Sequence, residues 1–279
     1  MSEAPKIPPV RYPEATAPDD SRPPTAGPAE VDAARAPAIA FIRSRRLSGR
    51  FVQIGAGSGS FTRQLIAECG AESILAVEPS DLRARNFTRT IAGSPALPAE
   101  VWLHTGAVSS LPDAWLNPHD TDPDRGGVYL SAVRIRRESR PVRPTTVDGL
   151  CRGFPSVALL CVNVDHHELE VMTSAFAALR RLRPELYIET TGETQPELTR
   201  LLRGAGYASV HVFKNAARYY IHVGMPALLG LACLRRIPGP SGHKLRLSLT
   251  AHMMTRSRNR LTTRPLSTGS FPAGASRVL

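Results

Sequence analysis

The stretch Gln53-Ile54-Gly55-Ala56-Gly57-Ser58-Gly59 closes a short apolar run that begins at residue 51. Three glycines in five residues let a chain leave a strand, turn sharply and bring backbone amides close to a ligand. Residues 61–69 then place apolar side chains at helical spacing, and Ser58 or Ser60 is in position to cap that helix. The pattern predicts a strand over 51–54, a glycine loop and a helix.

A second apolar run, residues 73–77, ends in Glu78, about 20 residues beyond the glycines. Doubly wound α/β folds place a carboxylate there, where it accepts hydrogen bonds from the ribose hydroxyls of a bound nucleoside. A dinucleotide fingerprint reads G-x-G-x-x-G, whereas here Ser60 holds the sixth position and the third glycine comes one residue early. The spacing therefore favours S-adenosylmethionine over NAD.

The rest of the chain alternates candidate helices and strands, as an α/β sheet requires. Helices are expected over 31–47, with an interruption near Pro37, and over 82–91, 169–182 and 196–203. Strands are expected over 101–105, 157–164 and 185–189, followed by a hairpin from 208–213 and 218–223. Residues 109–147 contain several prolines and glycines and predict a strand pair or long insertion, which we interpret as a substrate lid.

Several segments, taken in order, carry a resemblance to a known family. They are IGAGSGSFT (54–62), AVEPS (76–80), GAVSS (106–110), TTVDGL (145–150), LLCVNVDHHELEVMTSAFAALRRLRPELYIE (159–189) and LLRGAGY (201–207). Over about residues 45–225 the chain resembles the FkbM-type class I S-adenosylmethionine-dependent methyltransferases. The long segment at 159–189 is the most specific part of this resemblance.

The resemblance implies a Rossmann-like doubly wound sheet, mostly parallel, with a closing antiparallel hairpin. It implies that the three glycines hold the methionine part of S-adenosylmethionine, that Glu78 holds the ribose and that residues 106–108 hold the adenine. The predicted cofactor-binding residues are Gln53, Gly55, Ala56, Gly57, Ser58, Gly59, Glu78, Pro79, Ser80, Gly106, Ala107 and Val108.

The chain departs from the family pattern at three places. Gln53 stands where an acidic residue is usual, Cys161 and Asn163 replace a Lys and an Asp, and residues 165–167 replace a Glu-Gly-Ala turn. An amide at Gln53 still forms hydrogen bonds but lacks the attraction of a charge for a cationic ligand, so weaker cofactor binding is expected. A catalytically silent binding or scaffold protein is therefore an alternative function.

Catalytic groups are expected just after the fourth strand, near the point where the strand order reverses. His166 and His167, with an ordinary pKa near ~6.5, are candidates to accept a hydroxyl proton, and Asp165 either orients one of them, binds a sugar hydroxyl or caps the helix. A metal site from Asp165, His166 and Glu189 is the weaker interpretation, because no zinc spacing is present, and we predict no metal. The predicted function is O-methylation of a hydroxyl on a small molecule, sugar or glycosylated natural product.

Charge is distributed unevenly along the 279 residues, whose formal net charge is +11. Residues 235–279 carry nine Lys and Arg and no acid, whereas residues 1–30 carry three basic and five acidic side chains. We predict a disordered Pro-rich leader over 1–30, a methyltransferase domain over 31–225 and a basic, disordered tail over 226–279. Such a tail suits an RNA-associated protein, a second alternative, but with Phe271 as its sole aromatic it is better interpreted as a solvated extension.

The cysteines indicate a reducing compartment. Cys69, Cys151, Cys161 and Cys233 form no C-x-x-C pair, so they predict neither a zinc site nor a disulfide framework, and a cytoplasmic location is expected. No apolar segment typical of a signal peptide follows Met1, and the apolar run 225–234 is too short to span a bilayer.

Overall fold

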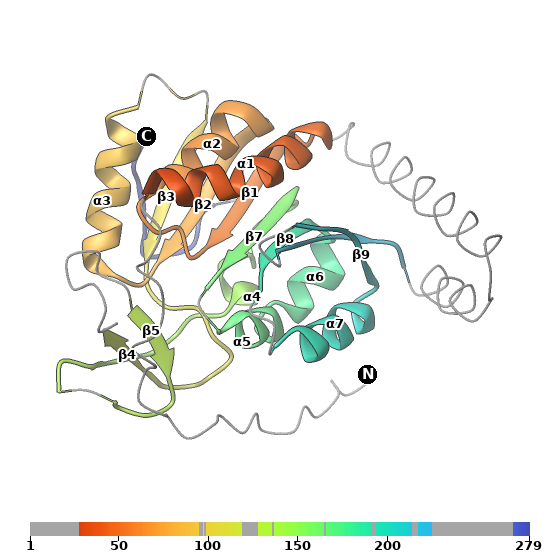
Figure 1. Ribbon diagram of the computed structural model, residues 1–279. Coiled ribbons are helices and arrows are strands. Elements are labelled where there is room, and N and C mark those ends of the chain that lie inside the picture. Colours follow the sequence, from red (N-terminus) through yellow and green to blue (C-terminus); the bar gives the residue numbers. More distant parts are fainter. Residues whose placement is uncertain are drawn as a thin grey trace.

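The computed structural model describes residues 28–94, 97, 99–118, 128–135, 137–164, 166–190, 194–213, 217–224 and 270–279. Within them, strands form a large sheet in the order β11-β3-β2-β1-β7-β8-β10-β9 and a small sheet in the order β5-β4-β6 (Figure 1). The strands of the large sheet are β1 (Gly49–Ile54), β2 (Ala71–Glu78), β3 (Glu100–Thr105), β7 (Leu159–Asn163), β8 (Glu185–Glu189), β9 (Tyr207–Val212), β10 (Arg218–His222) and β11 (Ala275–Arg277).

The centre of the large sheet is parallel. Strands β3, β2, β1, β7 and β8 run in one direction, with β1 paired to β2 on one side and to β7 on the other. Strand β10 is antiparallel to both β8 and β9, so the chain closes the sheet with the expected hairpin. The predicted fold class, a mostly parallel doubly wound sheet with a closing antiparallel hairpin, is confirmed.

Helices cover both faces of the sheet (Figure 1). One apolar cluster packs α1 (Pro28–Ser44), α2 (Ser60–Cys69) and α3 (Asp81–Ala92) on one face, and a second packs α4 (Val147–Leu150), α5 (Glu168–Thr173), α6 (Phe176–Leu182) and α7 (Gln195–Gly204) on the other. Strand β1 shows the alternation, since Phe51 belongs to the first cluster and Val52 and Ile54 belong to the second.

Helix α1 runs without interruption through Pro37, so the break expected there is wrong. Arg35 of the helix and Arg45, the residue after its last one, bind the two ends of β8. The Arg35 Nε lies 2.8 Å from an oxygen of Glu189, and Arg45 Nη2 lies 2.6 Å from an oxygen of Glu185. These ion pairs hold the helix across the strand, and this tertiary support offsets the backbone bond that a proline removes.

The single helix expected over 169–182 is two helices, α5 and α6, and the prediction is wrong in that respect. Asp148 on α4 explains the break, because its carboxylate accepts hydrogen bonds from the first amides of α6, those of Ala177 (3.1 Å) and Ala178 (2.6 Å). A side chain 30 residues earlier in the chain thus caps α6 and lets the backbone break near Ser174.

The predicted insertion contains the small antiparallel sheet, built from β4 (Ala114–Pro118), β5 (Val128–Ser131) and β6 (Arg140–Val142). A small apolar cluster of Ala107, Ala114, Leu116 and Leu130 joins this sheet to the segment that follows β3. The strand pair expected in this region is therefore part of a three-stranded sheet that is anchored to the large one.

The end of the chain forms an edge strand, so the prediction of a disordered tail is wrong for residues 270–279. Strand β11 pairs antiparallel with β3, and the ring of Phe271 stacks on Trp102 at a centroid distance of 4.5 Å. The rest of the tail, residues 225–269, and the leader up to residue 27 lie outside the described residues, while residues 28–30 belong to α1. None of the helices in the described ranges has both the length and the apolar character needed to cross a bilayer.

Candidate functional site

The glycine loop lies at the carboxyl end of β1 and has a backbone that suits glycine alone. Gly55, Gly57 and Gly59 have φ angles of 79°, 57° and 89°, in the left-handed region that side chains disfavour. A Cβ on Gly55 would lie 1.8 Å from the carbonyl oxygen of Asn163, at the end of the neighbouring strand β7. The first glycine therefore permits β1 and β7 to approach closely where they leave the sheet.

Glu78, at the carboxyl end of β2, fixes this loop. Its Oε2 accepts a hydrogen bond of 2.8 Å from the Gly57 amide, and its Oε1 accepts one of 2.9 Å from the Ser80 amide. The residue is only 3% exposed. A buried carboxylate thus links the middle of the glycine loop to the β2–α3 turn, and residues 53–59 meet the acidic residue predicted to act with them.

Two details of the loop differ from expectation. Helix α2 begins at Ser60, and Gly59, which has no side chain, occupies the N-cap position in place of the predicted Ser58 or Ser60. Gln53 is buried, and its Oε1 accepts a 2.7 Å hydrogen bond from the hydroxyl of Thr62 on α2. The side-chain oxygen of Gln53 is therefore bonded to the helix that follows the loop.

The predicted adenine segment lies beside Glu78. The amide of Gly106 donates to the backbone oxygen of Glu78 at 3.2 Å, and the following residues, Ala107 and Val108, are buried. Thr145 pairs with this segment, because its amide donates to the Ala107 oxygen at 2.9 Å. The structure thus brings the predicted ribose and adenine residues together, next to the end of the insertion.

The β2–α3 turn joins the site to the small sheet. The hydroxyl of Ser80 accepts a hydrogen bond from the Arg83 amide and caps α3, while the backbone oxygen of Pro79 accepts one from Arg140 at 3.0 Å. Arg140 also pairs with Asp81 at 3.1 Å. One arginine of β6 therefore docks the insertion onto the turn that carries two of the predicted cofactor residues.

The predicted catalytic turn follows β7. His166 is exposed, with a φ of 63°, and His167 is partly buried, with its Nδ1 4.0 Å from Oε2 of Glu170. Asp165 lies outside the described residues. The two histidines lie at the same end of the sheet as the glycine loop, because β1 and β7 are parallel neighbours and both segments follow the carboxyl ends of these strands.

Sequence reasoning missed two carboxylates on the first turn of α5. Glu168 and Glu170 are 2% and 7% exposed, and Oε2 of Glu168 accepts a 3.0 Å hydrogen bond from the hydroxyl of Thr194. Acidic residues are common on a first helical turn, which hides such positions in a sequence. The Glu-Leu-Glu spacing gives no signal of this burial, since an amphipathic helix rarely buries two carboxylates beside each other.

Glu189 is engaged in structural bonds. Its carboxylate accepts hydrogen bonds from Arg35 at 2.8 and 3.1 Å and from the Tyr187 hydroxyl at 3.0 Å. These bonds compete with a role as a metal ligand beside Asp165 and His166. Over the described ranges, no group of three His, Cys, Asp or Glu side chains is arranged to hold a metal ion.

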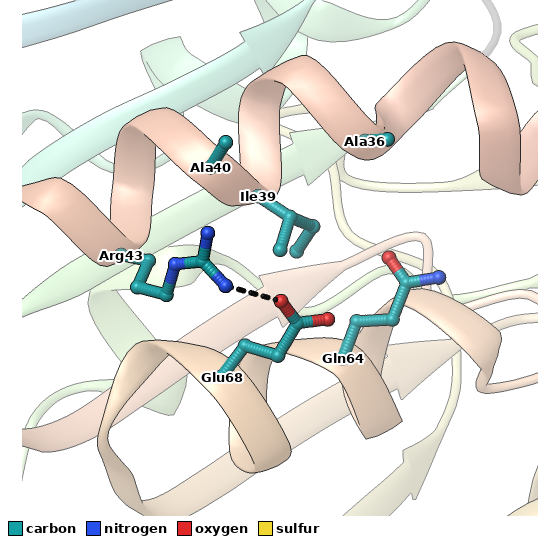
Figure 2. Close-up of a pocket in the computed structure, with 6 residues that line it drawn as sticks. All are labelled: Ala36, Ile39, Ala40, Arg43, Gln64 and Glu68. Atoms are coloured by element: carbon teal, nitrogen blue, oxygen red, sulfur yellow. Dashed lines mark hydrogen bonds and ion pairs between the residues drawn. The ribbon is translucent and has the colours of Figure 1, made fainter.

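A hollow of about 280 Å³ lies elsewhere, between the outer sides of α1 and α2 (Figure 2). Figure 2 shows the ion pair of Arg43 with Glu68 spanning the two helices, with the aliphatic side chain of Ile39 nearby. None of the predicted cofactor residues lines this hollow. We therefore locate the candidate site from the glycine loop, Glu78 and the β7 turn.

A parallel sheet with a glycine loop after its first strand, an acidic residue ending its second and an antiparallel strand near one edge defines the class I methyltransferases. The chain belongs to the FkbM methyltransferase family, because the model of the methyltransferase FkbM domain matches residues 53–209. The family resemblance that the sequence motifs carry is thereby confirmed.

Solved structures with a similar fold are distant in sequence. The methyltransferase FkbM from Methylobacillus flagellatus KT has 13% identity and a TM-score of 0.44, with 62% of this chain and 43% of that chain covered. A ribosomal protein L11 methylase from Lactobacillus delbrueckii subsp. bulgaricus has 11% identity and a TM-score of 0.43, with 71% and 80% covered. The magnesium protoporphyrin IX methyltransferase (ChlM) from Synechocystis PCC 6803, solved with bound SAM, has 9% identity and a TM-score of 0.41, with 70% and 79% covered. A search of curated proteins found no match.

Proposed function

We propose that the chain is an S-adenosylmethionine-dependent O-methyltransferase that acts on a hydroxyl of a small molecule, sugar or glycosylated natural product. The observation that carries the proposal is the bond between the Glu78 carboxylate and the Gly57 amide, which sets an acidic acceptor against a left-handed glycine loop. Membership of the FkbM family supports methyl transfer, and the hydroxyl acceptor is the finer part of the proposal.

The residues at the loop fit the cofactor. A Cβ placed on Gly57 would meet nothing within 4 Å, so the loop has open space in front of its middle glycine. The Glu78 carboxylate accepts the amides of Gly57 and Ser80, and a carboxylate is an acceptor of the kind that suits ribose hydroxyls. Gly106, Ala107 and Val108 would border the adenine, with Pro79 and Ser80 beside the ribose.

The bound cofactor would supply a methyl group already activated by its sulfonium, so the protein has to position the acceptor and remove a proton. Alignment of two reactants is worth several kcal/mol. His166 and His167 are the candidate bases, and an imidazole nitrogen would take the hydroxyl proton as the oxygen gains the methyl group. In this proposal Nε2 of His167 would accept the proton, with Oε2 of Glu170 lying 4.0 Å from Nδ1 on the other side of the ring.

Radiolabelled S-adenosylmethionine and a panel of hydroxylated acceptors test the proposal. We expect label in a base-stable methyl ether, and a fall in rate of about 10²-fold or more in His167→Ala or His166→Ala. His211→Ala, an exposed histidine on the hairpin strand β9, is the matched control and should keep the activity of the unmodified chain. Methylation confined to amine or thiol acceptors, or equal rates in all three variants, would contradict the proposal.

A catalytically silent binding protein is the second candidate, and the position of Gln53 favours it. Its side chain bonds to Thr62, so the loop has no charge at this position for the cationic end of the cofactor. This candidate predicts that the cofactor binds while every acceptor in the panel stays unlabelled. The use of the basic tail for RNA, the remaining alternative, concerns residues that lie mostly outside the described ranges.

A further inference from the structure

The segment after β5 presents aliphatic side chains to solvent. Val133 is 60% exposed and Ile135 is 40% exposed, two residues apart on the edge of the small sheet. The other large apolar side chains with comparable exposure in the described ranges, Val212 and Leu279, stand singly elsewhere. Single exposed apolar residues are ordinary, whereas two together on one short segment indicate a contact surface.

A buried asparagine holds this segment in place. Asn117 on β4 is fully buried, and its amide nitrogen donates to the Val133 oxygen at 3.4 Å while its Oδ1 accepts from the Ile135 amide at 3.0 Å. The hydroxyl of Ser139 also donates to that oxygen. The backbone of the segment is therefore fixed with both aliphatic side chains outward, at the cost of burying a polar group inside the small sheet.

Trp115 on β4 lies beside this segment, with its ring facing Arg134. It pairs with Ser131 and with Pro141 on the two neighbouring strands. Because side chains alternate along a strand, it lies on the face opposite its neighbour Leu116, which belongs to the apolar cluster of the insertion. The guanidinium carbon of Arg134 lies 5.5 Å from the centroid of the Trp115 ring. We call the surface formed by Trp115, Val133, Arg134, Ile135 and Arg137 the apolar–basic rim.

The charge around the rim is positive. Residues 128–143 contain five arginines and one glutamate, and two of these arginines, Arg140 and Arg143, face Asp81 and Asp113 from outside this range. Arg134, Arg137 and Arg143 are exposed, and Arg143 is 88% exposed even though it lies 3.8 Å from Asp113. The rim therefore combines an aromatic residue, two aliphatic residues and cations, which is the composition that suits the boundary between lipid headgroups and acyl chains.

We propose that the apolar–basic rim binds the surface of an anionic lipid bilayer. A stable protein partner needs about 800 Å² of surface on each side, far more than these few side chains supply. A bilayer requires no matched partner surface, because two inserted aliphatic side chains and several arginines near anionic headgroups act together. Arg140 attaches the small sheet to the β2–α3 turn, so binding of the rim to a bilayer would hold the candidate site close to the lipid surface.

Co-sedimentation of the full chain with vesicles tests the inference without reference to methyl transfer. Vesicles of phosphatidylcholine mixed with phosphatidylglycerol should bind the chain at least about tenfold more strongly than phosphatidylcholine alone. The double variant Val133→Ser with Ile135→Ser should lose about tenfold or more of that binding, because it removes the inserted apolar surface. Val212→Ser, which changes an exposed valine of β9, is the matched control and should bind as the unmodified chain does.

A second measurement separates the rim from the basic residues after 235. Brominated lipids quench indole fluorescence on contact, and we expect this quenching to be lost in Trp115→Phe. Unchanged vesicle binding in the double variant, or quenching that persists in Trp115→Phe, would assign the binding to another part of the chain and overturn the proposal. Absence of vesicle binding together with a shift from dimer to monomer in the double variant would also overturn it, because the rim would then join two copies of this chain.

Discussion

Single residues at the carboxyl ends of β1, β2 and β7 define the candidate site. Glu78 bonds to the loop amide of Gly57, and Gly55 permits close contact with the backbone of Asn163. These two contacts have different consequences for substitution, because one glycine faces a neighbouring strand and the other faces open space. The site therefore allows structural and ligand-binding roles to be separated residue by residue.

The first prediction contrasts Gly55→Ala with Gly57→Ala. A methyl group on Gly55 collides with the Asn163 carbonyl, so we expect a loss of about 3 kcal/mol or more in the free energy of unfolding. Gly57→Ala meets no atom within 4 Å and should cost about 1 kcal/mol, the usual penalty of a left-handed alanine. Urea unfolding measures both values.

Ligand binding by the same variants completes the test. Gly57→Ala should abolish S-adenosylhomocysteine binding despite its near-normal stability, because the methyl group enters the space assigned to the methionine part. Normal ligand affinity in a folded Gly57→Ala chain would place the ligand away from the loop.

At the scale of helices and strands, local patterns predicted much of the fold and missed what distant side chains determine. The strand at β8 and the helix–loop–strand order around the glycines were visible because hydrophobic periodicity is a local property. The break between α5 and α6 depends on Asp148, and the continuity of α1 through Pro37 depends on ion pairs with β8. The partner of Gln53 was equally hidden, since a hydrogen bond to Thr62 requires knowing how α2 packs on β1.

A second prediction concerns the attachment of α1. Arg45 and Glu185 form an ion pair with side-chain exposures of 2% and 3%, and Tyr219 donates a further hydrogen bond of 2.7 Å to Glu185. Arg45→Met leaves a buried carboxylate without its cation and should lower the free energy of unfolding by about 3–5 kcal/mol.

Arg43→Met, two residues earlier and in the last turn of α1, provides the control. Arg43 pairs with Glu68 at the surface, with exposures of 60% and 41%, and its loss should cost at most about 1 kcal/mol. Chemical denaturation of the two variants gives the comparison. Equal, small losses would show that α1 does not depend on its buried pair.

A third prediction concerns the C-terminal strand. Phe271 stacks on Trp102, and the guanidinium of Arg50 lies 4.7 Å from the Phe271 centroid, with its pKa lowered by burial. Phe271→Ala should remove about 2 kcal/mol of stability and increase hydrogen exchange of the β3 amides that face β11. Leu279→Ala, at an exposed terminal side chain, is the control. If the β3 amides are equally protected in both variants, β11 does not stabilise this edge of the sheet.

The molecule as a whole should be sensitive to alkali, which is the fourth prediction. Burial raises the pKa of both Cys69 and Cys151 to about 12. In the unfolded chain these thiols ionise at about pH 9, whereas in the folded chain they stay neutral to a higher pH. The stability that this difference contributes is fully present below about pH 9 and is lost as the pH rises toward about 12. The free energy of unfolding in urea should therefore begin to fall near pH 9 and continue to fall toward about pH 12.

Replacement of the two thiols checks the cause. Cys69→Ala with Cys151→Ala should flatten part of this decline, whatever it costs at neutral pH through lost packing. A pH dependence of the same slope in the double variant would assign the alkaline loss to other groups, among them Tyr219, whose pKa burial also raises.

The whole fold presents the glycine loop, Glu78 and the β7 turn at one end of the sheet, and we expect this end to bind S-adenosylmethionine. Calorimetric titration with S-adenosylmethionine and with S-adenosylhomocysteine tests it most directly, on the unmodified chain, on Glu78→Ala and on Glu72→Ala, an exposed glutamate of the same strand. We predict saturable binding that is lost in Glu78→Ala and retained in Glu72→Ala. A folded chain that binds neither ligand, or that binds them equally well without the Glu78 carboxylate, would contradict the claim.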